Sequence, residues 1–205
     1  MLIVDCEQGS DEWYQARLGI PTSSEFSNII TPARGDYSKS ATTYMHKLIA
    51  ESLTGKEATG FMSEWMERGK EMEEEARLWY EFTQGVDVQR IGFIYRDDRK
   101  EAGCSPDGLM DGKGLEIKCV APGTMVTYLL NGDIPREYIP QVQGSMWVTG
   151  HQEWDFLAYH PDFDPLLITV NRDKEYISRM EMHIAKFNKE RQEKLTRLLK
   201  QKEAA

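Results

Sequence analysis

Three residues stand out because their types and spacing could do chemistry at one point. A strand-like stretch places Glu116 and Lys118 on one face and Ile117 on the other. The glycine-rich turn at 110–114 would return Asp107 as the hairpin partner of Glu116. Clustered carboxylate oxygens suit a hard cation such as Mg²⁺, and a neighbouring lysine can orient or help to deprotonate an attacking water. The pattern therefore indicates phosphodiester hydrolysis.

The same pattern has a plain structural interpretation, which is a surface ion pair across a hairpin. An acid followed two residues later by lysine occurs three times, and the copies ending at Lys100 and Lys113 lie in hydrophilic, turn-like sequence. Only the copy ending at Lys118 follows a Pro-Asp pair with strand, turn and strand in order. Spacing alone leaves the ion pair and the site equally open.

The elements that must position these residues follow from periodicity and capping signals. We expect helices over residues 10–17, from Ser23 or Ser24 to about 31, and over 40–53, 62–83, 123–131, 137–149 and from about 173 onward. We expect strands over residues 86–95, 102–104, 115–120, 154–159 and 166–170. This order predicts an α/β (α+β) fold with a central mixed β-sheet flanked by helices, in a single domain spanning 1–205.

Composition limits the function classes. The chain has 205 residues, 40% of them hydrophobic and 29% charged, which is ordinary for a globular protein. No apolar run approaches the ~18 residues of a membrane span, and the amino terminus has no cationic leader. Three widely spaced cysteines are typical of reduced thiols, so we expect a cytoplasmic protein without a membrane partner.

The charge balance bears on nucleic-acid binding in two directions. The formal net charge is −9, which argues against a protein that neutralises phosphates. Residues 186–202, however, hold seven bases and only two acids, and carboxylates that bind cations would explain part of the acidic excess. Charge alone decides nothing here.

A family resemblance favours the site over the ion pair. The Pro106-Asp107 and Glu116-Ile117-Lys118 pairing resembles the Pro-Asp…Asp/Glu-x-Lys signature of restriction-endonuclease-like nucleases, and the surroundings are similar to the lambda-exonuclease type of phage and prophage recombination nucleases. Four blocks carry the resemblance in order, at residues 11–19 with Thr22 and Ser24, 69–73 with Ala76-Arg77, 102–109 and 141–149.

The resemblance implies an activity and its setting. It implies a Mg²⁺-dependent 5′→3′ exonuclease on double-stranded DNA, with Mn²⁺ able to substitute, that releases 5′-mononucleotides and leaves a 3′ single-stranded overhang. It further implies a homotrimeric ring threaded by DNA, a phage single-strand annealing protein as partner, and a phage- or prophage-encoded protein in the cytoplasm of a bacterial host. A restriction-endonuclease-like core is the implied fold.

The resemblance also implies roles for individual residues. Asp107 and Glu116 would ligate Mg²⁺ with the backbone carbonyl of Ile117, Lys118 would act on the attacking water, and Glu73 would be an outer or second-metal acid. The 5′-phosphate would be held by Arg17 and Ser24, with help from Ser105 and Gln141. Because Ser23 stands where relatives commonly carry alanine, it could share or replace the contact given to Ser24.

Several alternatives stay open. Arg17 could be a solvated arginine at a helix end, and Glu73 one acid of a solvated face. An endonuclease of the same fold and a catalytically silent DNA-binding scaffold are the rival functions. Trp13, Trp65, Trp79 and Trp147 are assigned to the core, Cys104 and Cys119 to buried small hydrophobes, and Gln143 to no role. The four histidines lack ligand spacing, so zinc is not expected.

Overall fold

The sheet that carries the candidate site has four strands. This computed structural model describes residues 1–57 and 64–203, and for residues 64–71 it describes the backbone only. The strand order of the sheet is β4-β5-β6-β7. The strands are β4 (Gly108–Met110), β5 (Lys113–Cys119), β6 (Glu153–Tyr159) and β7 (Leu166–Asn171). β5 and β6 are parallel and the other neighbours antiparallel. The predicted mixed sheet is therefore confirmed.

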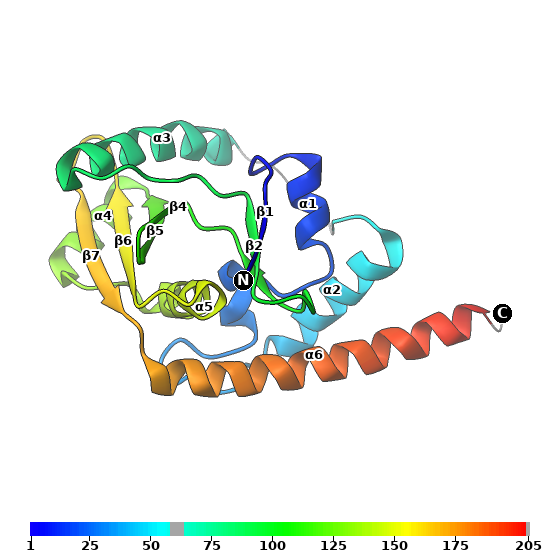
Figure 1. Ribbon diagram of the computed structural model, residues 1–205. Helices are drawn as coiled ribbons and strands as arrows, with labels where there is room; N and C mark the ends of the chain where they lie inside the picture. The colour runs from blue at the N-terminus through cyan, green and yellow to red at the C-terminus, as the bar shows by residue number, and fades with distance from the viewer. Residues whose placement is uncertain (58–63, 204–205) are drawn as a thin grey trace.

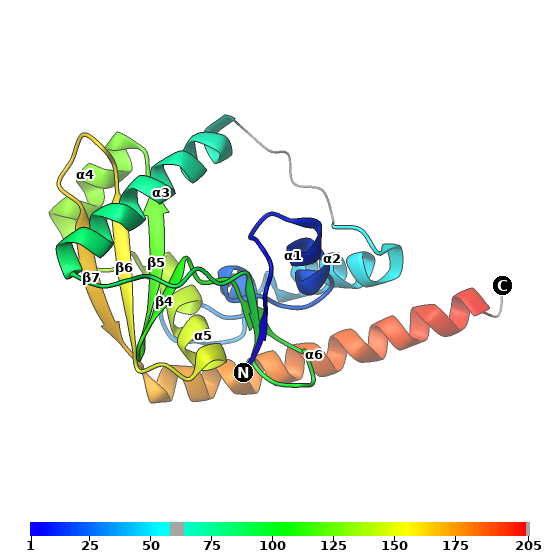
Figure 2. The same ribbon diagram turned by 45° about the horizontal axis from the view of Figure 1, so that its top comes forward.

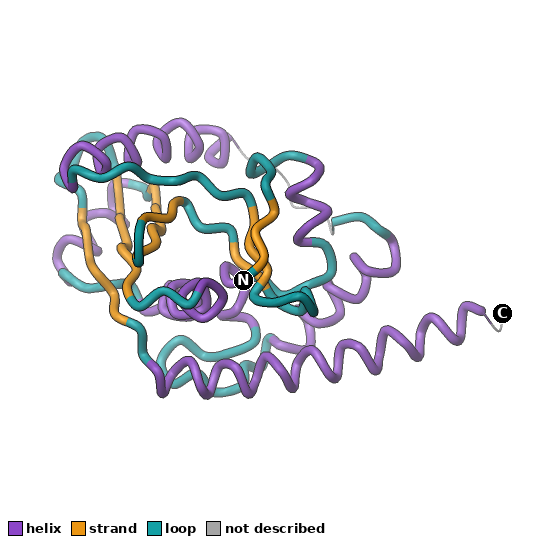
Figure 3. The backbone as a smooth tube through the Cα atoms, viewed as in Figure 1, coloured by secondary structure: helices purple, strands orange, loops and turns teal. Residues whose placement is uncertain are grey.

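A second, three-stranded antiparallel sheet was not expected. It consists of β1 (Leu2–Val4), β2 (Phe93–Tyr95) and β3 (Gly103–Cys104) in that order. β1 was missed because an isolated run of three apolar residues gives too little alternation to identify a strand. The strand predicted over 86–95 is wrong in its first part, since residues 86–92 run mainly as a loop, coloured teal in Figure 3.

Most helices lie close to their predicted places, but the one predicted from Ser23 or Ser24 to about 31 is a 3₁₀ turn that ends at Asn28. The helices are α1 (Asp11–Arg17), α2 (Ala41–Thr54), α3 (Glu64–Gln84), α4 (Pro122–Asn131), α5 (Ile139–Thr149) and α6 (Lys174–Glu203), with short 3₁₀ turns η1 (Ser23–Asn28) and η2 (Arg136–Tyr138). Residues 62 and 63, where the third helix was predicted to start, lie outside the described residues. Ser10 caps α1 by accepting from the Trp13 backbone N–H at 3.3 Å.

Helices cover both faces of the four-stranded sheet. On one face, α3 packs against an apolar cluster built around Leu115, Ile117 and Leu157. On the other face, α5 joins the larger core, which includes Phe156 and Trp154. Figure 2 shows α3 crossing in front of β5 to β7. Figure 1 shows α6 running beneath α5 and α2 and then extending past the rest of the chain.

The alternation of β5 decides which groups reach the site. Leu115 and Ile117 face α3, so Glu116 and Lys118 face α5. The mixed α/β class predicted from the element order is confirmed, with two sheets where one was expected. The single domain spanning 1–205 stays a prediction. Within the described residues, no helix is both long enough and apolar enough to cross a membrane.

Candidate active site

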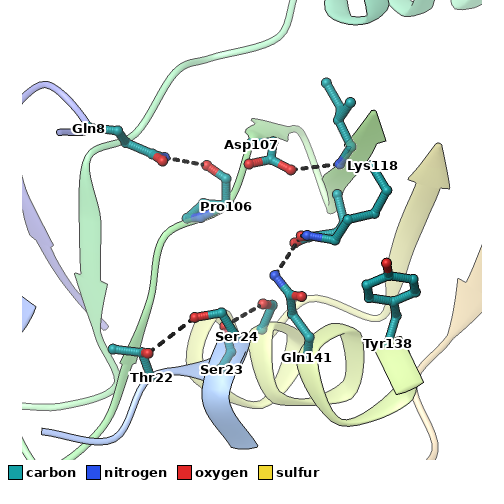
Figure 4. Close-up of polar contacts among 12 residues, drawn as sticks. Gln8, Thr22, Ser23, Ser24, Pro106, Asp107, Lys118, Tyr138 and Gln141 are labelled. Atoms are coloured by element: carbon teal, nitrogen blue, oxygen red, sulfur yellow. Dashed lines mark hydrogen bonds and ion pairs between the residues drawn. The ribbon is translucent and has the colours of Figure 1, made fainter. Parts of the chain in front are cut away.

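The hairpin of β4 and β5 brings the two acids together. Gly108 pairs with Leu115, so Asp107 comes to lie beside Glu116, as the hairpin predicted. The turn closes at Gly112, whose φ of 76° is the left-handed conformation that glycine adopts without cost. Asp107 Oδ2 accepts a hydrogen bond from the backbone N–H of Ile117 at 2.6 Å. Figure 4 shows Asp107 entering from the loop before β4.

Glu116 is a buried acid with one oxygen in use. Its residue is 1% exposed, and Oε1 pairs with Lys118 Nζ and accepts from Gln141 Nε2 at 2.5 Å. Oε2 is buried too and has no hydrogen-bond partner among the described residues. A buried carboxylate oxygen without a donor is costly, so this atom fits a cation bound on the Asp107 side.

Electrostatics in the hairpin point to the same conclusion. Burial first and the Glu116 charge second raise the pKa of Asp107 well above its usual range, against a smaller lowering by Lys118. Burial alone would lower the pKa of Lys118, but the charges of Glu116 and Asp107 outweigh it and raise that pKa. Two ionised carboxylates beside one lysine leave one negative charge uncompensated, and a divalent cation would balance it.

The Ile117 backbone faces the acid that it contacts. Within a strand, the N–H and C=O of one residue point to the same side. Because its N–H donates to Asp107, the Ile117 carbonyl also faces that side of β5. The structure thus brings together the three predicted metal ligands. No group of three or more His, Cys, Asp or Glu side chains suited to a metal occurs in the described part of the chain, so any site here needs this carbonyl, water or substrate oxygens.

Glu73 approaches from the other face of the sheet, on α3. It is half-buried, and its charge contributes to the raised pKa of Asp107. Burial raises the pKa of Cys119 to about 12, and Glu73 is the next contributor. Glu73 therefore lies near the end of β5 and within electrostatic reach of the acid pair. The side chains of residues 69–71 of the same predicted block lie outside the described residues.

Arg17 lies in a separate small cavity rather than in bulk solvent. The cavity measures about 70 Å³ and is lined by groups that include Tyr14, Thr22 and Lys47. The guanidinium stacks 4.1 Å from the centre of the Trp13 ring, and burial lowers the pKa of Arg17. The assignment of Trp13 to the core is wrong, because its half-buried ring supports Arg17 instead. Arginine and tryptophan four residues apart on a helix could have suggested this pair.

Ser105 joins the arginine to the acid pair. Its Oγ accepts from Arg17 Nη1 at 2.9 Å and from Trp13 Nε1 at 2.8 Å. These two bonds occupy the acceptor positions of the hydroxyl, so its own proton is the donor that remains. Ser105 lies two residues before Asp107, so the residue that contacts Arg17 is joined by a short segment to the hairpin that holds the acid pair.

The two neighbouring serines of η1 differ in exposure. Ser23 is 2% exposed, and its hydroxyl is hydrogen-bonded by Ser145 at 3.0 Å. Ser24 is exposed, and its hydroxyl lies 3.2 Å from that of Thr22, which lines the Arg17 cavity. Of the two serines, Ser24 is the one whose hydroxyl can reach a ligand. Its phosphate role stays a prediction.

Gln141 lies beside the acid pair, because its side-chain amide donates to Glu116 (Figure 4). Its part in holding the 5′-phosphate stays a prediction. Gln143, which had no assigned role, donates to the Asn171 carbonyl and accepts from the Asp173 N–H, both at 2.9 Å. It therefore joins α5 to the β7–α6 connection and serves the fold.

Sequence reasoning missed Gln8. Its side-chain amide donates to the carbonyls of Ile91 and Pro106, both at 2.8 Å, and so anchors the loop immediately before Asp107 (Figure 4). A glutamine in an irregular amino-terminal segment carries no pattern, because its partners lie 83 and 98 residues away. Tyr138 was also missed, and its ring lies 5.3 Å from Lys118 Nζ.

Comparisons with known proteins found one family model and several solved structures to which this chain is similar. Residues 12–152 match the model of the YqaJ-like viral recombinase domain. The chain is similar to the alkaline exonuclease LHK-Exo from Laribacter hongkongensis, at 32% identity over 95% of this chain and 98% of that chain, with a TM-score of 0.84. A structure of LHK-Exo in complex with dAMP, at the same identity and coverage, gives 0.85. A phage related exonuclease from Haemophilus somnus 129PT, 14% identical over 87% of this chain and 96% of that chain, shares the fold at 0.64. No match was found among curated proteins.

Proposed function

The chain belongs to the family of YqaJ-like viral recombinase domains, and from this membership we propose that it is a Mg²⁺-dependent exonuclease. It would digest the 5′ strand of linear double-stranded DNA in the 5′→3′ direction, releasing 5′-mononucleotides and leaving a 3′ overhang. Its 32% identical relative, the alkaline exonuclease LHK-Exo, supports the reaction class.

One observation carries the end-directed part of the proposal. Ser105 contacts Arg17 at 2.9 Å and lies two residues before Asp107, so an anion held by the guanidinium and Ser105 would lie near the acid pair. A terminal phosphate offers more charge and more free oxygens than an internal phosphodiester. Arginine recognises such groups bidentately, which favours an end over the middle of a strand.

The acid pair fits a divalent cation. Asp107, Glu116 Oε2 and the Ile117 carbonyl would hold it, and Glu73 would serve as an outer or second-metal acid. A bound Mg²⁺, or Mn²⁺ in its place, would stabilise the negative charge that develops on the phosphate. Oxygen ligands in a partly protein-built site are those that Mg²⁺ prefers.

The side chains around the pair have separable tasks. Lys118 is charged and held by Glu116, so it can orient the attacking water and stabilise developing charge. Gln141 fixes the same acid from α5, which leaves Oε2 directed elsewhere. The donors for the terminal phosphate would be Arg17, the remaining Ser105 proton and the exposed Ser24 hydroxyl.

The experiment that tests the function uses three DNA substrates in parallel. Linear duplexes with a 5′-phosphate or a 5′-hydroxyl and a closed circle of the same sequence are incubated with Mg²⁺ and with chelator. The proposal expects 5′-mononucleotides from the phosphorylated duplex first, less from the hydroxyl duplex, and none from the circle. Cutting of the circle would identify the internal cutter of the same fold, and binding without products would identify the silent scaffold.

Assembly and setting extend the proposal. An acidic chain of net charge −9 would hold duplex DNA more firmly as a homotrimeric ring that encloses it than as a monomer. The 3′ overhang would be handed to a phage single-strand annealing protein. We propose in addition that the protein is encoded by a phage or prophage and acts in the cytoplasm of a bacterial host.

A further inference from the structure

Asp155 is a buried acid that the proposed reaction does not use. It lies on β6, is 2% exposed, and faces α3. Tyr80 Oη and Thr169 Oγ1 each donate to it at 2.6 Å, and Lys113 Nζ lies 3.3 Å from both of its oxygens (all side-chain contacts). A buried carboxylate is costly unless it is fully hydrogen-bonded, and these donors from three elements meet that requirement.

The elements tied by Asp155 include two that carry residues of the proposed cation site. Lys113 begins β5, the strand of Glu116 and Lys118, and Tyr80 belongs to α3, the helix of Glu73. A well-packed apolar residue in place of such a buried ion commonly leaves stability equal or higher. The hydrogen bond from Tyr80 to Asp155 is directional, so it defines the position of α3 along the sheet.

The positions of Tyr80 and Glu73 on α3 are correlated. They are seven residues apart, so they lie on one face, about 20° apart in rotation and about 10 Å apart along the axis. On the sheet, Asp155 pairs with Leu115, and Tyr159 pairs with Cys119. Those pairs are separated by about 13 Å. Tyr80 therefore contacts one end of β5 while the Glu73 charge acts at the other, on Cys119 and Asp107.

Most of the remaining contacts under α3 are apolar, although Tyr159 on β6 also shares a side-chain hydrogen bond with Glu75 of α3. Ala76 lies between the two positions and packs with the Tyr80 ring in the cluster around Leu115 and Leu157. Apolar contacts are non-directional and specify the placement of a helix along its axis less strictly than a hydrogen bond. Sliding α3 by one turn would displace Glu73 by about 5.4 Å and remove it from the acid pair.

We propose that the hydrogen bond from Tyr80 to Asp155 is a positioning contact that holds α3 where Glu73 lies toward the Cys119 end of β5, near the acid pair. This inference rests on the proposed function, because it gives Glu73 a part in binding the cation. Tyr80 touches neither the cation nor DNA and acts only through Glu73.

The test is Tyr80→Phe, which keeps the ring and removes the hydroxyl. Mn²⁺ affinity, measured by titration calorimetry on the full chain without DNA, is expected to fall about tenfold, as with other residues that support metal ligands. The Mg²⁺ concentration for half-maximal digestion should rise by a similar factor, with turnover at saturating Mg²⁺ close to wild type. Unchanged Mn²⁺ affinity in a folded Tyr80→Phe variant would overturn the proposal.

Thr169→Val is the matched control. It removes another donor to the same carboxylate, but from β7, which carries none of the site residues. Its melting temperature should fall as in Tyr80→Phe while its Mn²⁺ affinity stays at the wild-type value. Equal losses of affinity in the two variants would mean that Asp155 merely stabilises the fold.

A double-mutant cycle connects the effect to Glu73. In a Glu73→Gln background, adding Tyr80→Phe should lower Mn²⁺ affinity no further, whereas additive losses would contradict the proposal. If Tyr80→Phe does not fold, the isosteric Asp155→Asn weakens the same bond and is tested for the same coupling. Wild-type digestion of linear duplex is recorded first. If the wild type digests duplex but Tyr80→Phe binds Mn²⁺ normally, only this inference is wrong. If Tyr80→Phe weakens Mn²⁺ binding but the wild type digests no duplex, only the proposed function is wrong.

Discussion

Gln141 on α5 and Glu116 on β5 share a hydrogen bond of 2.5 Å, from the side-chain amide to Oε1. Lys118 pairs with that same oxygen, while Oε2 of the acid is buried without a donor. Two donors on one oxygen orient the carboxylate, so the other oxygen stays available to a cation. The relationship lets Gln141 orient a proposed cation ligand, in addition to its predicted contact with the 5′-phosphate.

Gln141→Leu should weaken cation binding. Without the amide, Glu116 loses one of its two orienting partners, and Mn²⁺ affinity is expected to fall about tenfold. Calorimetric titration measures it. Gln143→Leu, on the same helix but bonded to the Asn171 carbonyl, should lower the melting temperature and leave Mn²⁺ affinity unchanged. A Gln141 variant that binds Mn²⁺ normally but loses its preference for 5′-phosphate would show that Gln141 serves the phosphate and not the cation.

Asp107→Asn should abolish cleavage and raise the stability of the metal-free protein. The folded-state pKa of Asp107 is raised, so its stabilising contribution is complete below the unfolded value of about 3.9 and is lost as pH rises through the folded pKa. At neutral pH the wild type therefore carries a cost that asparagine removes. Thermal melts in chelator should show the variant more stable. Added Mg²⁺ should stabilise only the wild type, and near-normal Mg²⁺-dependent cleavage by the variant would disprove the ligand assignment.

Lys118→Ala should affect turnover more than binding. The ammonium lies against Glu116. In the proposed reaction it acts on the attacking water or on developing charge, and such groups contribute about 10²–10⁴-fold to rate. Single-turnover digestion and a separate DNA-binding titration distinguish the two effects. If affinity collapses while turnover survives, Lys118 is a phosphate anchor.

Arg17→Ala should remove the preference for phosphorylated ends. Charge-assisted hydrogen bonds of this kind contribute roughly 1.5–3 kcal/mol, which corresponds to about a tenfold to hundredfold loss on 5′-phosphorylated duplex. Digestion of 5′-phosphate and 5′-hydroxyl duplexes is compared for each protein. Arg99→Ala, in which the lost side chain is exposed and paired with Asp97, is the control and should keep the preference. An unchanged preference in the Arg17 variant would refute terminal-phosphate recognition.

The protein should run in solution as a trimer. An acidic monomer would hold duplex DNA poorly, whereas a closed ring retains DNA with fewer cationic contacts. Light scattering across a range of protein and salt concentrations measures the mass. A monomer that nevertheless digests long duplexes processively would rule out the ring.

The sequence by itself determined the family and the hairpin. The four ordered blocks predicted the lambda-exonuclease resemblance, which the match over residues 12–152 and the alkaline exonuclease structure confirm. The pairing of Asp107 with Glu116 was predictable because a two-residue alternation and a short turn act over about ten residues. Both signals are local, because the residues between Asp107 and Glu116 contain the alternation and the turn that predict the pairing.

Only the tertiary structure decided which distant groups meet that hairpin. Gln141 reaches Glu116 because α5 packs on the even-numbered face of β5, and Asp155 receives Tyr80 because α3 packs on the odd-numbered face. The buried Ser23 and the exposed Ser24 are neighbours that no local pattern separates. The contacts of Gln141 with Glu116 and of Tyr80 with Asp155 join residues tens of positions apart. Their formation depends on the packing of whole helices on the sheet. Local propensity and periodicity carry no information about that packing.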